Sequence, residues 1–328
     1  MSKAKKALGR LKLLSKYLTT RTLDLMYKSF VRPHMDFCDV IYHEPSKDSV
    51  FGQMLTKLME DVEKLQYKAA LIATGTWQGS NRLKVYDELG WESLSDRRRS
   101  RRILSLYKIV NGNTPLYLRE LLPQQILNAD GPPPQLQATA RYNATERFKN
   151  SFLSNAIKEW NVVMPHFMTM PSYLNLKKHL LTLFRPAKKS IFNISDPRGA
   201  KYIFQIRVGL SPLRAHKFQH NFADTPTSSC TCGLDAESTS HFLFKCPIYA
   251  PQRASLAMSV IAVLTLRNLN QLANSVAIYL YGHPDLPEDD NKKVLEATIK
   301  FIKETILPSP SPRPFPYLKH VQNISFFH

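Results

Sequence analysis

Three of the four cysteines lie within seventeen residues, with one histidine between them. They are Cys230, Cys232 and Cys246, and His241 completes the spacing C-x-C-x8-H-x4-C. Three thiolates and one imidazole suit a tetrahedral zinc ion that is closed in by four protein ligands. Gly233, directly after the second cysteine, allows the backbone to turn back over a metal. The spacing therefore predicts one structural zinc site, although its C-x-C half is tighter than the usual two-residue gap.

Two other interpretations of these residues stay open. Buried cysteines also occur as small apolar core residues, beside a histidine on a helix surface. His216 and His220 are spaced i,i+4 and precede Cys230 closely, so one of them could replace a weak ligand. A disulfide framework is not expected, because Cys38 stands alone and the other three cluster. The clustering indicates a metal in a reducing compartment.

The chain carries a large excess of positive charge. Its 328 residues include 45 Lys and Arg against 26 Asp and Glu, for a formal net charge of +19. The excess is shared along the chain, with 22 basic and 13 acidic residues in 1–122 and 23 and 13 in the remainder. Such a charge favours a polyanionic partner, of which nucleic acid is the commonest.

No targeting or membrane segment is predicted. The N-terminus leads into an amphipathic stretch with Arg10, Lys12 and Lys16, which is unlike an uncharged signal core. The longest apolar run, residues 256–266, has about half the length that a membrane span requires. We therefore expect an intracellular protein of the nucleus or cytoplasm with no membrane partner.

Apolar residues recur at helical spacing over most of the chain, whereas strand signals are weak. The strongest pattern predicts one long helix over residues 50–74 with a continuous buried face. That face consists of Leu55, Leu58, Val62, Leu65 and Ala69. Other helices are expected at about residues 8–18, 23–31, 95–110, 148–160, 173–184, 202–222, 253–266, 269–281 and 291–306. The fold class predicted is mainly α, with Trp77, Trp91 and Trp160 in the core.

The helix expected over residues 95–110 carries five arginines in its first two turns. Cations at a helix N-terminus oppose the macrodipole, and like charges spaced i,i+4 repel. A solvated basic face is the default interpretation. Because the arrangement costs folding energy, phosphate binding is the alternative. The candidate phosphate ligands are Arg97, Arg98, Arg101 and Arg102, with Lys201, Arg207, Arg214 and Lys217 near the metal motif.

Proline and glycine divide the chain into four parts. Pro123, Gly131 and the three prolines of residues 132–134 interrupt regular structure. Residues 1–122 are expected to form one helical domain and residues 123–147 a linker. Residues 148–306 form a second helical domain that contains the zinc motif of residues 230–246. Residues 307–328 are a proline-rich tail, which is unsuited to helix or sheet.

Several short sequence segments follow one another along the chain. They are FVRP at 30–33, FCDVI at 37–41, EKLQ at 63–66, YDELGWESL at 86–94, Arg97-Arg98, WN at 160–161, RVGLS at 207–211, and Leu213, His216, Phe218, His220 and Phe222. With the Cys/His motif, this order resembles the region beyond the polymerase palm in LINE-type (non-LTR, jockey/CR1-like) retrotransposon reverse transcriptases. The likeness covers about residues 8–305. It implies a thumb-like first domain and a zinc-bearing C-terminal helical domain that grip a nucleic-acid template, primer or target.

The catalytic residues of that family are missing from this sequence. The family's palm carboxylates hold two Mg²⁺ ions in an aromatic-x-Asp-Asp turn. The only Asp-Asp pair here is Asp289-Asp290, which stands where a helix N-cap is expected. We find no endonuclease carboxylate–histidine set, no P-loop and no nucleophile elbow. The chain is therefore expected not to polymerise or cut nucleic acid by itself.

Three functions remain open from the sequence. The preferred one is a non-catalytic nucleic-acid-binding fragment of such a reverse transcriptase, which would act beside a separate palm domain. The second is a protein-interaction scaffold derived from a mobile element, which would show no salt-dependent binding of nucleic acid. The third is a zinc hydrolase or deaminase. It lacks the His-x-Glu signature, and Glu237 lies in the ligand loop without a paired motif.

Overall fold

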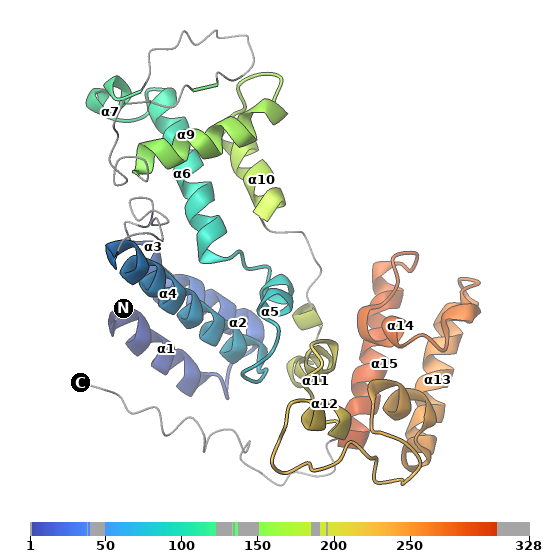
Figure 1. The fold of residues 1–328 in the computed structure, drawn as a ribbon. Coiled ribbons are helices and arrows are strands. Elements are labelled where there is room, and N and C mark those ends of the chain that lie inside the picture. The colour runs from blue at the N-terminus through green and yellow to red at the C-terminus, as the bar shows by residue number, and fades with distance from the viewer. Residues whose placement is uncertain are drawn as a thin grey trace. The chain divides into compact units, whose positions relative to one another are not determined.

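A computed structural model describes residues 2–37, 39, 50–122, 133, 135–136, 151–184, 191–194 and 196–306, except for the side chains of residues 50–52, 55 and 193. Within these ranges the chain is mainly helical, as predicted, and contains no strand (Figure 1). One isolated antiparallel bridge joins Ser229 and Ala236. The chain divides into two compact units, Met1–Ser195 and Asp196–His328, and we describe each by itself.

The helices of the first unit begin and end where the sequence supplies capping groups. The side chains of Thr19, Asn81 and Ser93 each accept a hydrogen bond from a backbone N–H in the following helical turn. Gly90 adopts a left-handed conformation directly after Leu89 and ends that helix. The elements are α1 (Ser2–Leu14), α2 (Thr20–Met26), η1 (Tyr27–Val31), α3 (Pro33–Asp36), α4 (Val50–Thr74), α5 (Arg82–Leu89), α6 (Leu94–Val110), α7 (Leu116–Glu120), α9 (Phe152–Val163), η2 (Met164–His166), α10 (Tyr173–Phe184) and η3 (Ile191–Asn193).

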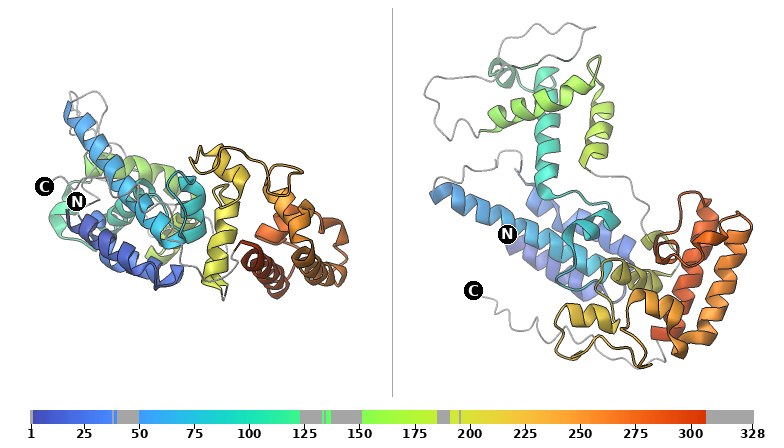
Figure 2. Two further views of the ribbon diagram at one scale, coloured as in Figure 1. Left: turned by 90° about the horizontal axis from the view of Figure 1, so that it is seen from below. Right: turned by 45° about the vertical axis from the view of Figure 1, so that its right-hand side comes forward.

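The long helix predicted over residues 50–74 is present as α4, an uninterrupted helix of 25 residues (Figure 2). The second half of its predicted face is covered, with Leu65 and Ala69 buried and Val62 half-buried. Leu58 is 40% exposed, so the prediction that it is buried is wrong. Leu55 lies outside the described side chains. The first half of α4 therefore keeps a partly exposed apolar surface at Leu58.

The second core of this unit forms where α9 and α10 pack on α6. Trp160 and Ile157 of α9, Leu106 of α6 and Leu176 of α10 are all fully buried in one cluster. Residues 148–184 thus belong with the first unit, and the observed division lies at residues 195/196, not at the linker expected over residues 123–147. The sequence pattern marked a break in regular structure there, but packing continues across it. Most of residues 123–147, and all of residues 307–328, lie outside the described chain.

The second unit is built around α13 and α15, which pack side by side and enclose Phe301 and Val260. Asp196 caps α11 by accepting hydrogen bonds from the backbone N–H groups of Arg198 and Gly199. The elements are α11 (Pro197–Arg207), α12 (Arg214–Gln219), η4 (His241–Lys245), η5 (Pro247–Tyr249), α13 (Ala250–Thr265), η6 (Asn270–Leu272), α14 (Val276–Tyr281) and α15 (Glu288–Ile306).

The Asp-Asp pair of the sequence lies in the first turn of α15. Asp290 is buried and forms ion pairs with Arg267, at 2.8 Å, and Lys293, at 3.1 Å. Asp289 is exposed. Acidic residues in a first helical turn are stabilised by the macrodipole. Both aspartates thus lie within the first turn of this helix and not at the cap that the sequence predicted, and Asp290 is held there by its ion pairs.

We expect Gly199→Ala to destabilise the second unit. A Cβ at Gly199 in α11 would lie 2.1 Å from Cγ2 of Ile299 in α15, so the two helices touch at this glycine. Overpacking a rigid contact of this kind typically costs about 1–3 kcal/mol. Thermal unfolding followed by circular dichroism would measure the loss, and Gly9→Ala, at a position with open space, is the control. Equal melting temperatures for the two variants would contradict the close approach of α11 and α15.

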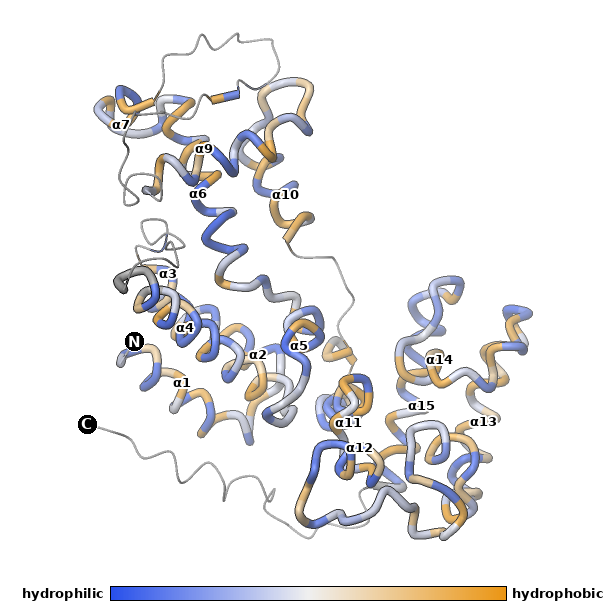
Figure 3. The backbone as a smooth tube through the Cα atoms, viewed as in Figure 1, coloured by the Kyte–Doolittle hydropathy of each residue, from blue (hydrophilic) through white to orange (hydrophobic). Residues whose placement is uncertain are grey.

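Hydrophilic and hydrophobic residues alternate along most helices, as expected for helices that bury one face (Figure 3). Among the described residues, no helix combines the length and the hydropathy that crossing a membrane requires.

Candidate metal centre and basic residues

The four ligands predicted for zinc converge in the second unit. One ligand atom from each of Cys230, Cys232, His241 and Cys246 lies within 4.8 Å of all the others. The sulfur atoms of Cys230 and Cys246 are 3.6 Å apart, and Sγ of Cys232 is 3.2 Å from Nε2 of His241. A tetrahedral ion with Zn–S bonds of about 2.3 Å requires sulfur atoms about 3.8 Å apart. The cysteines are free thiols, and this separation is far longer than a disulfide bond.

A tight turn brings the first two ligands together. The N–H of Gly233 donates to the carbonyl of Cys230 at 3.0 Å, and the N–H of Cys230 donates to the carbonyl of Asp235 at 2.8 Å. Gly233 has φ of +78°, a left-handed conformation that glycine adopts without strain. The turn that the sequence predicted at this glycine is therefore present.

The other two ligands come from one wide helical turn. The element η4 is a π-helix that begins at His241, and the N–H of Cys246 donates to the carbonyl of His241 at 2.8 Å. This i→i+5 hydrogen bond explains the four-residue gap, because it closes one turn between the two ligands. Pro247 then starts η5 and ends the turn. His241 and Cys246 are both buried, at 2% and 0% exposure.

Neighbouring side chains hold the cluster from two sides. The guanidinium of Arg253 in α13 donates to the backbone carbonyls of Phe244 and Cys246. The buried carboxylate of Glu237 accepts a hydrogen bond of 2.8 Å from the N–H of Arg214, at the start of α12. The ligand loop is thus tied to both α13 and α12. These contacts orient the backbone of the ligands, which is the role of outer-shell residues in metal sites.

The donor set fits a metal cation. Burial raises the pKa of the Cys230 thiol to about 11, and the neighbouring thiol groups add to the effect. A divalent cation bound by the sulfurs would favour the thiolate instead. Nδ1 of His241 is buried without a hydrogen-bond partner and lies 3.9 Å from a carboxylate oxygen of Asp235. Metal-bound histidines commonly direct that second nitrogen to a carboxylate.

His216 and His220 are not part of the converged set. Nδ1 of His216 is 2.7 Å from the hydroxyl of Ser211, and Nε2 of His220 is 3.2 Å from the carbonyl of Gly209. Burial, with the nearby His220, lowers the pKa of His216. Both histidines therefore serve the local structure around α12 in this arrangement.

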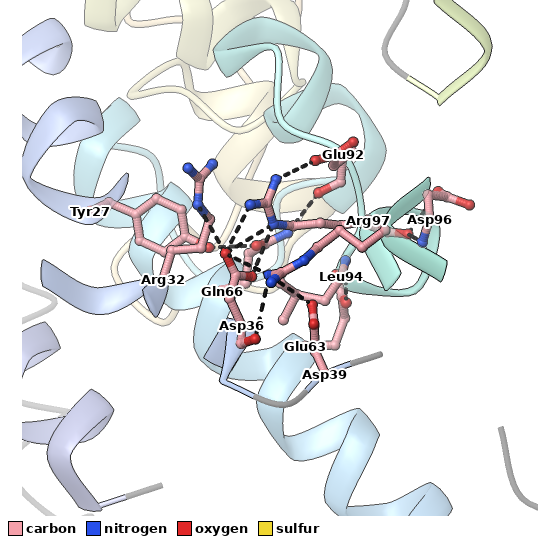
Figure 4. A network of polar contacts seen from close by, with 12 residues as sticks. Tyr27, Arg32, Asp36, Asp39, Glu63, Gln66, Glu92, Leu94, Asp96 and Arg97 are labelled. Carbon is pink, nitrogen blue, oxygen red and sulfur yellow. Dashed lines mark hydrogen bonds and ion pairs between the residues drawn. The ribbon is translucent and has the colours of Figure 1, made fainter. Parts of the chain in front are cut away.

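The arginines at the start of α6 are engaged by carboxylates of the same unit. Arg97 forms ion pairs of 2.8 Å with both Asp36 and Glu92 (Figure 4). Burial alone would lower the pKa of Arg97, but its hydrogen bonds to Asp36 raise that pKa above the ordinary value. Nη1 of Arg101 lies 3.1 Å from Oδ2 of Asp39 and 3.4 Å from Oδ2 of Asp36. Asp36 thus joins two turns of α6 to the end of α3.

The other two candidate arginines of α6 are buried. Arg102 pairs with Glu159 of α9 through two hydrogen bonds, and only 4% of its side chain is exposed. Arg98 is 8% exposed. This arrangement argues against phosphate binding by Arg97, Arg98, Arg101 and Arg102. The carboxylates compensate the repulsion that suggested a phosphate partner.

The basic candidates near the metal motif also have intramolecular contacts. Arg207 donates to the carbonyl of Leu280 and lies over the ring of Tyr281. Lys217 pairs with Asp224 at 2.8 Å. Arg214 reaches the hydroxyl of Thr227 at 3.5 Å, and Lys201 is half-buried with a pKa lowered by burial. Lys201 and Arg214 form no ion pair with a carboxylate of the described chain.

Two of the three tryptophans are core residues, as predicted. Trp160 is fully buried, and Trp91 is 7% exposed and stacks on Tyr27 with ring centroids 3.9 Å apart. Trp77 is half-buried.

Sequence reasoning did not identify the carboxylates that neutralise α6. Asp36 and Glu159 lie about sixty residues from their arginines, on either side in the sequence. No local spacing rule connects residues so far apart. The one local signal was Glu92, five residues before Arg97.

No family model matches this chain, and comparisons with curated proteins and with solved structures give no significant match.

Proposed function

We propose that this chain is a non-catalytic nucleic-acid-binding protein whose C-terminal unit is stabilised by one zinc ion. The net charge of +19 is the observation that carries the proposal, because a polyanion is the partner that such a charge favours. The likeness to the post-palm region of non-LTR reverse transcriptases supports the same function and agrees with a protein of the nucleus or cytoplasm.

Zinc is the ion that the donor set favours. Three thiolates and one imidazole in tetrahedral reach select a soft or borderline cation, and structural zinc sites use this ligand set. Cys230, Cys232, His241 and Cys246 would hold the ion, which would link the turn at Gly233 to η4. Four protein ligands leave no open position for a water or substrate.

The contacts of Glu237 argue against the hydrolase or deaminase interpretation. Such enzymes place a glutamate beside the metal as a general acid or base. Glu237 is buried, and its carboxylate accepts the N–H of Arg214 at the start of α12. A glutamate held in this way supports a structural role in the ligand loop.

A protein partner has a separate observation in its favour. Met54 and Leu58 of α4 are 64% and 40% exposed on a helix whose later turns are buried. An apolar helix face that begins in solvent and continues into the core suits a further domain that completes the packing. A separate palm domain, which the family likeness implies, would fit this surface. A protein-interaction scaffold is the second candidate function for the same reason.

A salt titration tests the nucleic-acid proposal. We expect the purified protein to bind oligonucleotides of unrelated sequence with similar affinity, and log K to fall linearly with log salt. The slope should be about −0.7 per phosphate contact for single strands and about −0.9 for duplexes. Fluorescence anisotropy at several salt concentrations measures it. Binding that is absent or independent of salt would refute the proposal and favour the scaffold.

A further inference from the structure

The start of the first unit carries a run of positive charge that no acidic residue interrupts. Six cations occur in residues 3–16, and the first acidic residue of the chain is Asp24. The six are Lys3, Lys5, Lys6, Arg10, Lys12 and Lys16. All six are exposed, and none forms an ion pair within the described chain.

This pattern contrasts with the arginines of α6. There, Asp36, Asp39, Glu92 and Glu159 neutralise the charges inside the unit. In α1 the first turn contains no acidic residue, and lysines occupy it instead. Cations there oppose the macrodipole, and Lys6/Arg10 is a like-charged i,i+4 pair. The charge of α1 is therefore uncompensated by the described part of the protein itself.

The orientation of α1 is fixed by its other face. Ala4, Leu8 and Leu11 are buried, and α1 packs on η1 and α4. The cations consequently share the outward side of a helix that is about 20 Å long. Because the apolar stripe is already covered, α1 cannot insert that stripe into a lipid surface as an interfacial helix does.

An aromatic residue extends this surface. Tyr17 directly follows Lys16 and is 83% exposed, and Leu13, one turn earlier, is 73% exposed. Single-stranded nucleic acid is bound by positively charged surfaces with aromatic rings on which unpaired bases stack. A duplex does not offer an unpaired base to such a ring. The combination of uncompensated cations and an open tyrosine therefore fits a single strand.

We propose that the outward face of α1, with Lys16 and Tyr17, is a binding surface for single-stranded nucleic acid without sequence preference. The proposal rests on the nucleic-acid-binding function proposed above and assigns its phosphate contacts to α1. The cations contact phosphates of the strand, and the ring of Tyr17 stacks on a base. This location replaces the start of α6, whose arginines are engaged within the protein.

Neutralising the five cations of α1 together with Lys16 tests the location. The variant carries Gln at all six positions, and its matched control carries Gln at six exposed lysines of the same unit: Lys57, Lys68, Lys84, Lys158, Lys177 and Lys178. Both changes remove six charges, so a general effect of net charge would be equal in the two. The probes are oligo(dT) and oligo(rU) of about twenty nucleotides, which is ample for a short strand-binding site.

We expect the α1 variant to bind both probes at least tenfold more weakly at low salt than the control variant. Its salt slope should fall by about 0.7 for each phosphate that is no longer bound, up to about 4 for six phosphates. Tyr17→Ala should weaken binding by about fivefold or more, whereas Tyr17→Phe keeps the ring and the affinity. Circular dichroism should show unchanged helix content, because the buried face of α1 is untouched.

The outcomes separate this inference from the proposed function. If the wild-type protein binds and the two six-residue variants lose affinity equally, the α1 surface is refuted while the nucleic-acid function stands. If the wild-type protein binds neither probe, both proposals fall. Wild-type binding to phosphatidylserine vesicles that α1 neutralisation abolishes, with oligonucleotide binding unchanged, would assign the surface to anionic lipid and overturn the inference.

Discussion

Replacing Cys246 with serine is expected to release the metal and to unfold the ligand loop of residues 230–246. Cys246 is fully buried, and its sulfur atom lies 3.6 Å from the sulfur atom of Cys230. Small structural zinc sites bind their ion with an apparent free energy of about 10–16 kcal/mol. Because the site is not formed in the unfolded chain, this free energy also stabilises the folded state. The loss of one of four ligands should therefore cost several kcal/mol of stability in the second unit.

Metal content and stability are measured together in this test. We expect one zinc per chain by elemental analysis for the wild type and a clear deficit for Cys246→Ser. Chelation of the wild type should reproduce the lowered melting temperature, and added zinc should reverse it. Cys38→Ser is the control, because Cys38 stands outside the motif in the sequence. A wild-type protein that binds no zinc and melts like Cys246→Ser would refute the site.

The convergence of the four candidate ligands could be predicted from sequence because its determinants are local. The spacing of residues 230–246 contains all four ligands and the glycine of the first turn. The structure adds two features that the spacing does not show. One is the π-helical turn that places His241 and Cys246 together, and the other is the attachment of the loop to α12 by Glu237.

The helices were predictable for the same reason, and their packing was not. Periodicity identified α4 from one end to the other, since the pattern depends on neighbouring turns. It could not show that Leu58 stays open while Leu65 is buried, because burial depends on which other elements lie nearby. The division of the chain followed the packing of α9 on α6 and not the prolines between them.

The arginines of α6 show the same limit at a candidate site. Their spacing correctly indicated a repulsion that something must compensate. Glu92 lies only five residues before Arg97, but Asp36 and Glu159 lie about sixty residues from their arginines, one in each direction. A cluster of like charges in a sequence thus identifies an electrostatic cost. Whether a ligand or the protein itself offsets that cost depends on the fold.

The ion pair between Arg102 and Glu159 gives the sharpest test of whether the protein's own carboxylates neutralise the α6 arginines. We expect Glu159→Gln to destabilise the protein by about 3–5 kcal/mol, because it leaves a buried guanidinium without its counter-charge. Arg102 has 4% of its side chain exposed and Glu159 has 13%, so water cannot replace the missing carboxylate. Arg99, 3.7 Å from the same carboxylate, takes part in a weaker ion pair that the change would also remove.

Chemical denaturation would measure this destabilisation against a matched exposed pair. Asp61 and Lys64 of α4 are 3.2 Å apart, with 42% and 65% of their side chains exposed. Asp61→Asn should therefore cost at most about 1 kcal/mol. The double change Arg102→Met with Glu159→Leu should recover much of the stability that Glu159→Gln removes, since it takes away the buried charge together with its partner. Equal effects of Glu159→Gln and Asp61→Asn would mean that Arg102 is hydrated in solution. The α6 arginines would then again be open to a phosphate partner.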